Sequence, residues 1–225
     1  MAKKVFVSAL FAGLAAGVLA ALLQFVFVVP SMMEGELYEV GTRVHFGANG
    51  AQSPAGVPSI MHEMGRHTTT FTSNLVVYTG FGLLMVVGFA FAESFGRKID
   101  ARTGLIWGLC GFAAVHLATA FGLPPKLPGM VAADIVARQV WWIGTIIATL
   151  IGLGLIGYGR GIAVILMGFV IILIPHILGA PTLDTYFGVA PPELAGLYVA
   201  RSLGVAAISW AVLGAIAGAI WAKEA

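Results

Sequence analysis

Long apolar runs dominate the chain, and polar residues gather in the segments between them. A run of about 20 apolar residues can cross the hydrocarbon core of a bilayer as a helix, because backbone groups in lipid must pair within their own segment. Six runs meet this expectation: 5–29, 71–92, 104–122, 140–157, 162–178 and 203–222. They leave long, Pro-rich outer loops at 30–70, 123–139 and 179–202. The pattern predicts an all-α integral membrane protein, a single transmembrane domain over residues 1–225 built as a bundle of about six transmembrane helices.

Composition supports this prediction and excludes other classes of protein. The 225 residues are 59% hydrophobic and 10% charged, with a mean hydropathy of +0.97, which is too little polar material for the surface of a soluble globule. A net charge of +2 is too small to indicate binding to nucleic acid. The single cysteine excludes an internal disulfide. The first run is longer than the roughly 7–15 residues of a signal-peptide core, so we expect a retained helix.

The distribution of charge predicts the orientation. With Lys3 and Lys4 in the cytoplasm, seven basic residues fall on that side and five on the other, and the short inner loops are the more basic per residue. The positive-inside rule therefore places both termini in the cytoplasm. Acidic residues have the opposite bias, and the seven on the outer side are Glu34, Glu36, Glu39, Glu63, Asp134, Asp184 and Glu193. We interpret this excess of outer carboxylates as a sign of function.

Two glycine motifs indicate how the helices associate. Gly13-x-x-x-Gly17 and Gly214-x-x-x-Gly218 have the spacing that lets helix backbones approach closely in lipid. We expect these faces to pack within the bundle, and homo-oligomerisation is the alternative.

The outer loops contain a possible repeat. The loops that begin at Pro124 and Pro191 each lead to a Val-Ala-Arg sequence, which ends at Arg138 in one loop and at Arg201 in the other. We interpret them as parts of three related outward-facing helical hairpins, the first with Pro30 closing its leading helix. Chance similarity between Pro-rich loops is a rival explanation.

Glu36 and Glu39 form the first candidate metal site. If their segment is helical, the i,i+3 spacing puts both carboxylates on one face. Carboxylate oxygens suit a divalent cation that prefers oxygen ligands. A solvated acidic loop is an equally weighted alternative.

The second candidate is the segment His62-Glu63-Met64-Gly65-Arg66-His67. It fails the zinc-protease pattern, which needs histidines four residues apart on one helical face, because the second histidine comes fifth. As a loop, the segment still offers the imidazoles of His62 and His67 to a transition metal. An exposed loop with incidental histidines is the alternative.

The third candidate consists of His116 and His176, near the outer ends of two apolar runs. Ionisable side chains at membrane depth are costly and usually face a bundle interior or an aqueous cavity. Pro175 also removes a helical hydrogen bond beside His176. We predict two neutral imidazoles directed at an outer vestibule, and the alternative is that each one hydrogen-bonds a neighbouring helix.

No motif indicates an enzyme. The sequence contains no Gly-x-x-x-x-Gly-Lys phosphate loop, because no lysine follows a glycine, and it contains no dinucleotide-binding motif. We also find no pairing of a nucleophile with a base, so catalysis is not expected.

Four ordered motifs resemble the CbtA family of probable cobalt transporter subunits. The matching segments are Gly35-Glu36-Leu37-Tyr38-Glu39, Gly122-Leu123-Pro124-Pro125-Lys126-Leu127-Pro128-Gly129, Arg138-Gln139-Val140-Trp141-Trp142 and Pro175-His176-Ile177-Leu178-Gly179-Ala180-Pro181. They are similar, in that order, to the family's Ala-Glu-x-Tyr-Glu, Gly-Leu-Pro-Pro-Glu-Leu-Pro-Gly, Arg-Gln-x-Trp-Trp and Pro-His-x-x-Gly-Ala-Pro. Lys126 replaces the expected glutamate. The family is usually described with five spans, and an odd number would put the termini on opposite sides.

The resemblance implies a bacterial inner-membrane protein that takes up cobalt together with CbtB, a small partner with one span and a histidine-rich end. We therefore expect Co²⁺, or a similar divalent cation, to arrive from the periplasm, bind Glu36 and Glu39, and pass to His116 and His176 as water is stripped. Weak successive sites let an ion leave as well as bind. The alternative is a non-transporting structural subunit of a larger membrane complex, with the Pro-rich loops as docking surfaces.

Overall fold

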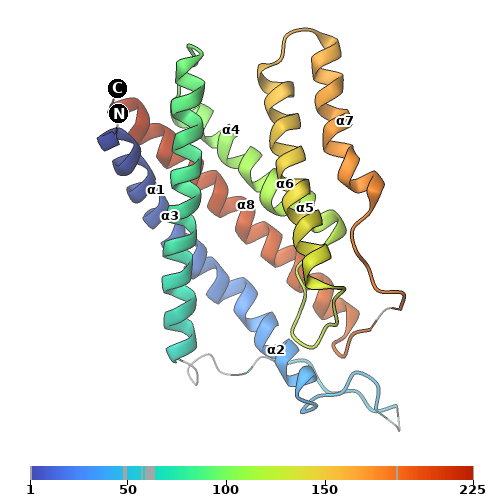
Figure 1. Cartoon of the computed structure of the whole chain (residues 1–225). Coiled ribbons are helices and arrows are strands. Elements are labelled where there is room, and N and C mark those ends of the chain that lie inside the picture. Colours follow the sequence, from blue (N-terminus) through green and yellow to red (C-terminus); the bar gives the residue numbers. More distant parts are fainter. Residues whose placement is uncertain (1, 48–49, 57, 59–63, 186, 225) are drawn as a thin grey trace. The chain divides into compact units, whose positions relative to one another are not determined.

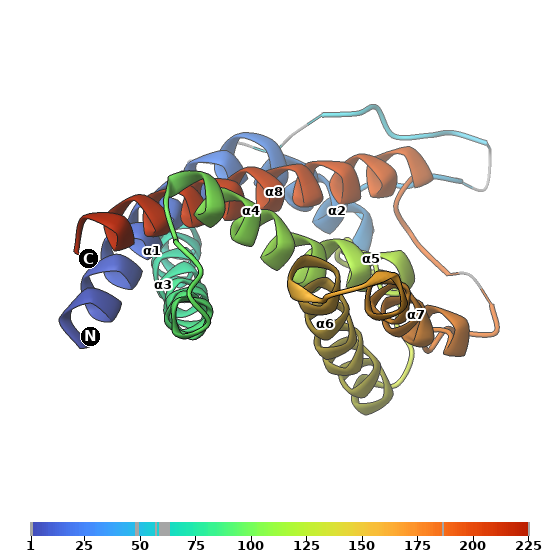
Figure 2. The same ribbon diagram turned by 90° about the horizontal axis from the view of Figure 1, so that it is seen from above.

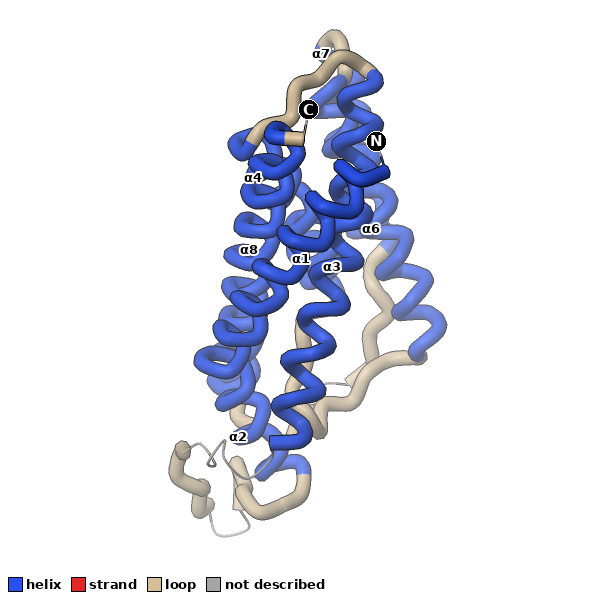
Figure 3. Tube along the Cα trace, turned by 90° about the vertical axis from the view of Figure 1, so that its left-hand side faces the viewer, coloured by secondary structure: helices blue, strands red, loops and turns tan. Residues whose placement is uncertain are grey.

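The computed structural model describes residues 2–47, 50–56, 58, 64–185 and 187–224. Within these ranges the chain is helical and has no strand, as Figure 3 shows. The elements are α1 (Ala2–Leu23), η1 (Gln24–Val28), α2 (Val29–Glu39), α3 (Met64–Ser94), α4 (Ala101–Phe112), η3 (Ala113–Leu117), α5 (Ala118–Gly122), α6 (Ile135–Tyr158), α7 (Ile162–Leu178) and α8 (Pro192–Lys223). The prediction of an all-α membrane protein is confirmed.

Six apolar helices are present in the described part of the chain, and five of them are long enough to cross a bilayer. These five are Ala2–Glu39, Gly65–Ser94, Ala101–Gly122, Ile135–Tyr158 and Pro192–Lys223. The sixth, α7, has 17 residues. At 1.5 Å per residue it spans about 26 Å, near the lower limit for a crossing.

Several helices run further than the apolar pattern predicts. The first continues to Glu39, and α8 begins at Pro192, because helical hydrogen bonds can continue into polar sequence beyond the hydrocarbon. The expectation that Pro30 ends the first helix is wrong. The wider π-helical turn η1 ends at Val28, two residues before Pro30, and accommodates a residue that has no N–H to donate. The outer loops are correspondingly shorter than expected.

The helices form two compact units. One consists of Met1–Val28, Ser59–Phe112 and Gly204–Ala225, and the other of Val29–Pro58 and Ala113–Leu203. In the first unit α1 packs along α3, and in the second α6 and α7 lie side by side as a hairpin (Figures 1 and 2).

Glycines bring the helix backbones of the first unit together. At Gly17 an added Cβ would lie 2.9 Å from the carbonyl oxygen of Asn74 in α3. At Gly214 of α8 it would overlap the carbonyl oxygen of Gly104 in α4. Both glycine motifs therefore serve close packing within the chain, which confirms the packing interpretation.

The two ends of the chain also meet in this unit. Lys3 Nζ lies 3.6 Å from Oε2 of Glu224. Oε1 of Glu93, at the end of α3, accepts a hydrogen bond of 2.8 Å from Trp221 Nε1 in α8 and lies 3.2 Å from Nζ of Lys4. Termini on one side of a membrane require an even number of crossings. These contacts therefore favour six spans, with α7 as the short one, over five.

Candidate functional site

Three segments that follow apolar helices meet in the second unit. Tyr38 of α2, Leu127 of the Pro-rich loop and Ala190 before α8 form a buried cluster. Gly35 of α2 is so close to this loop that an added Cβ would lie 3.0 Å from Cδ2 of Leu127. Gly129 makes the loop's turn at a φ of 77°, which glycine adopts readily because it has no Cβ. This shared apolar cluster fixes the polar residues around it.

One cavity of about 380 Å³ adjoins the cluster, and we call it the acidic cavity. Its wall includes Tyr38 and Leu194 from the apolar cluster and the polar side chains of Glu34, His45 and Glu193. These three polar residues come from α2, from the segment that follows it and from the first turn of α8.

Glu34 ties the segment after α2 to the helix. Its carboxylate is largely buried, and Oε1 accepts hydrogen bonds from Nη1 of Arg43 at 2.9 Å and from the backbone N–H of Gly56 at 3.0 Å. The same segment is also held by a hydrogen bond of 3.0 Å that the backbone N–H of Val44 donates to Oγ of Ser53. The charge of Glu34 is therefore compensated by Arg43.

Glu193 has a different environment. It is exposed, and it lies in the first turn of α8, where the helix dipole stabilises a carboxylate. His45, which is half-buried, adds an imidazole to the same cavity. The acidic cavity thus combines one compensated carboxylate, one exposed carboxylate and one histidine.

Glu36 and Glu39 lie on α2, so the helical arrangement on which their pairing depends is confirmed. Glu36 is half-buried, Glu39 is exposed, and the backbone of Glu39 lies against Gly129. Glu34, rather than either of these two, is the α2 carboxylate that lines the acidic cavity.

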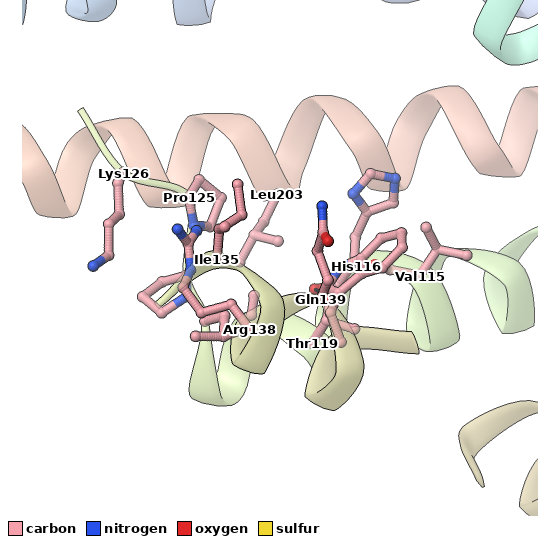
Figure 4. A pocket seen from close by; sticks show the side chains of 13 residues that line it. Val115, His116, Thr119, Pro125, Lys126, Ile135, Arg138, Gln139 and Leu203 are labelled. Carbon is pink, nitrogen blue, oxygen red and sulfur yellow. Dashed lines mark hydrogen bonds between the residues drawn. The ribbon is translucent and has the colours of Figure 1, made fainter. Parts of the chain in front are cut away.

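His116 lies in η3 and lines a second cavity, of about 530 Å³, which we call the basic cavity. Lys126, Arg138 and Gln139 share its wall (Figure 4). Lys126 Nζ donates a hydrogen bond of 2.9 Å to the carbonyl oxygen of Val131. Partial burial, and then the positive charge of Arg138, lower the pKa of Lys126 below its usual value. A divalent cation is repelled by these two cations.

His176 lies near the end of α7 between aromatic rings. Its ring centroid is 5.2 Å from that of Phe121 and 5.9 Å from that of Trp141, both in edge-to-face geometry. Trp141 Nε1 donates a hydrogen bond of 2.9 Å to the carbonyl oxygen of Pro175. Nδ1 of His176 is buried and has no hydrogen-bond partner among the described residues.

The remaining predicted ligands lie elsewhere. His67 is buried in the first unit, with its ring centroid 5.4 Å from that of Phe25. His62 lies outside the described residues. Within the ranges that the structure describes, no group of three or more His, Cys, Asp or Glu side chains is arranged to hold a metal ion. The shared metal path through the six predicted residues stays a prediction.

Sequence reasoning did not single out His45 and Glu193 as partners of Glu34. The available signal was the excess of acidic residues on the outer side, to which Glu34 and Glu193 both belong. Glu34 and Glu193 are more than 150 positions apart in the sequence, so the sequence pattern does not indicate that they line the same cavity.

A comparison with protein families gives a match over nearly the whole chain. The family model for the probable cobalt transporter subunit (CbtA) matches residues 2–222, which is nearly the whole chain. Comparisons with curated proteins and with solved structures give no significant match.

Proposed function

The chain belongs to the family of probable cobalt transporter subunits, and from this premise we propose that it is the membrane subunit that admits Co²⁺, or a similar divalent cation, from the periplasm. The match over residues 2–222, in a chain with five long apolar helices, is the observation that carries the proposal. As such a subunit it would move the ion without catalysing a covalent reaction. The inner membrane is its proposed location, with both termini in the cytoplasm.

The acidic cavity is the proposed place of capture. Six waters at about 30 Å³ each occupy roughly 180 Å³, so a hydrated divalent cation fits into a cavity of about 380 Å³. Glu193 and His45 would contact the water shell without replacing it. Carboxylates at a cavity mouth raise the local concentration of cations, and such weak binding lets the ion move on.

Glu36 and Glu39, which lie on the same helix as Glu34, are proposed to add negative electrostatic potential near the acidic cavity. Among the histidines, His176 is the stronger candidate for a later ligand, because the basic cavity around His116 contains two cations. His62 and His67 complete the proposed set. The membrane potential supplies about 2.3 kcal/mol per charge per 100 mV, which would draw a divalent cation inward.

A small subunit with one span and a histidine-rich end is the proposed partner. This partner would pass the metal to the chain or accept it from the chain. Cobalt uptake is therefore measured with and without the partner.

The test is uptake of radioactive cobalt by cells that express the chain and this partner. Glu193→Gln should raise the cobalt concentration for half-maximal uptake by about threefold to tenfold, since one exposed charge near a hydrated ion is worth roughly 1 kcal/mol. Glu36→Gln and His176→Ala are measured beside it. The matched control is Asp184→Asn, which removes an exposed outer carboxylate that does not line the acidic cavity.

Two failures are distinguishable. No uptake above that of cells lacking the protein contradicts the transport function. Uptake that Glu193→Gln and His45→Gln leave unchanged contradicts only the capture cavity.

A further inference from the structure

The basic cavity lies where membrane-crossing helices end. His116 and Thr119 come from the last turns of the third apolar helix, Arg138 and Gln139 from the first turns of α6, and Lys126 from the loop that joins them. In Figure 4 the two cationic side chains occupy one end of the lining, and Gln139 and His116 the other. Helices that cross a bilayer end near the lipid headgroups, so we expect this cavity at that depth.

The charge of this cavity is of one sign. Lys126 and Arg138 are the charged residues among its described lining, and no carboxylate is part of it. Asp134 lies between them in sequence and caps the N-terminus of α6. Its Oδ1 accepts a hydrogen bond of 2.9 Å from the backbone N–H of Ala137. The two cations therefore face the cavity without a carboxylate to balance them.

The donors of this cavity are not all used within the protein. Nε of Arg138 is buried and has no hydrogen-bond partner among the described residues. Among the residues that the structure describes, Lys126 donates one hydrogen bond, to the carbonyl oxygen of Val131, and an ammonium group has three donors. Like charges that share a cavity repel each other, and an anion between them removes that cost. A phosphate group suits both, since guanidinium binds phosphate through parallel hydrogen bonds and ammonium binds it as a point charge.

The rest of the wall is apolar and open to lipid. Val115, Leu123 and Leu203 line the cavity, Trp142 is 40% exposed, and Ile135 is 62% exposed. Free phosphate gains nothing from contact with an apolar surface, whereas the acyl chain of a lipid can pack against it. We propose that the basic cavity binds an anionic phospholipid, with Arg138 and Lys126 holding its phosphate and the apolar wall contacting its acyl chain. Basic pockets between membrane helices bind lipid headgroups in this manner.

This lipid site shares no lining residue with the acidic cavity, the proposed place of metal capture, although His116 belongs both to its wall and to the proposed metal ligands. Its cations repel Co²⁺, and a bound headgroup would neutralise them. The lipid would also join α6 to the loop that packs on α2 through Leu127.

The test measures lipid bound to the purified, full-length chain in detergent by native mass spectrometry. The protein is titrated with dioleoyl phosphatidylglycerol and, separately, with dioleoyl phosphatidylcholine, which has the same acyl chains and no net charge. We expect wild type to bind the anionic lipid at least tenfold more tightly. The double variant Lys126→Gln, Arg138→Gln should lose about tenfold or more of that affinity, because two charge-assisted contacts are removed.

Controls separate the headgroup site from unspecific effects. Arg160→Gln removes an exposed charge outside the cavity and should change nothing. Lys126→Arg keeps the charge and should bind like wild type, which shows that the position tolerates substitution. Inorganic phosphate at millimolar concentration should displace part of the anionic lipid.

Three results would overturn the proposal. They are equal binding of both lipids, unchanged affinity in the double variant, and binding of inorganic phosphate without competition from phosphatidylglycerol.

Discussion

Nη1 of Arg43 donates a hydrogen bond of 2.9 Å to Oε1 of Glu34, and this ion pair sets the charge of the acidic cavity. The side chains are 18% and 12% exposed, so the pair is only partly screened by water. Arg43 balances the charge of Glu34, and among the described residues no ion pair balances the charge of Glu193. We therefore expect the cavity to attract cations weakly, as the proposed capture of a transported ion requires.

Removing the guanidinium should therefore strengthen capture. In Arg43→Gln the second hydrogen bond to Glu34, from Gly56 N at 3.0 Å, can persist while the positive charge is lost. We expect the cobalt concentration for half-maximal uptake to fall by about twofold to fivefold, or roughly 0.4–1 kcal/mol. Uptake is measured over a range of cobalt concentrations, with Arg97→Gln, in the segment between α3 and α4, as the control. A higher half-maximal concentration would show that the ion pair supports the site instead of neutralising it.

Binding of anionic lipid should decline with rising pH because of Lys126. A lysine has an ordinary pKa of 10.5, and partial burial together with Arg138 lowers that of Lys126. The protonated ammonium holds the phosphate, so affinity should fall as the pH rises through this lowered pKa. His116 and Arg138 are the other titratable or charged groups that line the cavity, and a variant at position 126 separates their contribution from that of Lys126.

Lys126→Arg is the control for this pH profile, because a guanidinium keeps its charge throughout. Its lipid affinity should stay flat up to about pH 10. A decline of equal size in this variant would assign the effect to another group.

Close backbone contact between α4 and α8 should make Gly214 intolerant of larger residues. A Cβ at this position would overlap the carbonyl oxygen of Gly104 and lie 2.8 Å from Cα of Gly108. Gly214→Leu should lower stability by about 3 kcal/mol, at the upper end of overpacking effects. Gly204→Leu is the matched control, since it lies on the same helix with nothing within 4 Å of an added Cβ. Thermal unfolding in detergent measures both, and equal melting temperatures would contradict the packing of these helices.

Labelling of single cysteines should decide whether α7 crosses the membrane. Cys110 is the chain's own cysteine, so Cys110→Ala gives a clean background. Arg160→Cys precedes α7 and Ala180→Cys follows it. With six crossings, an impermeant maleimide should label these two positions from opposite sides, and Lys98→Cys from the same side as Arg160→Cys. Labelling of positions 160 and 180 from one side would mean five crossings and would conflict with the contact between Lys3 and Glu224.

The amino-acid sequence was enough to predict where the apolar helices lie and that glycine faces bring them together. Both follow from local rules, since each lipid-exposed segment must pair its own backbone groups and small residues allow close approach. The predicted range 162–178 agrees with α7. The prediction that the first helix ends at Pro30 was wrong, because the composition does not reveal the π-helical turn η1 that lets the helix continue through this proline.

Tertiary structure decided which polar residues share a cavity and what charge each cavity has. Glu34 meets Glu193 because segments distant in sequence pack around Tyr38, Leu127 and Ala190. His116 meets Arg138 because the Pro-rich loop folds the start of α6 back onto η3 and α5. The potential of a cavity is the sum over all groups that line it, and only the packed chain determines which groups those are.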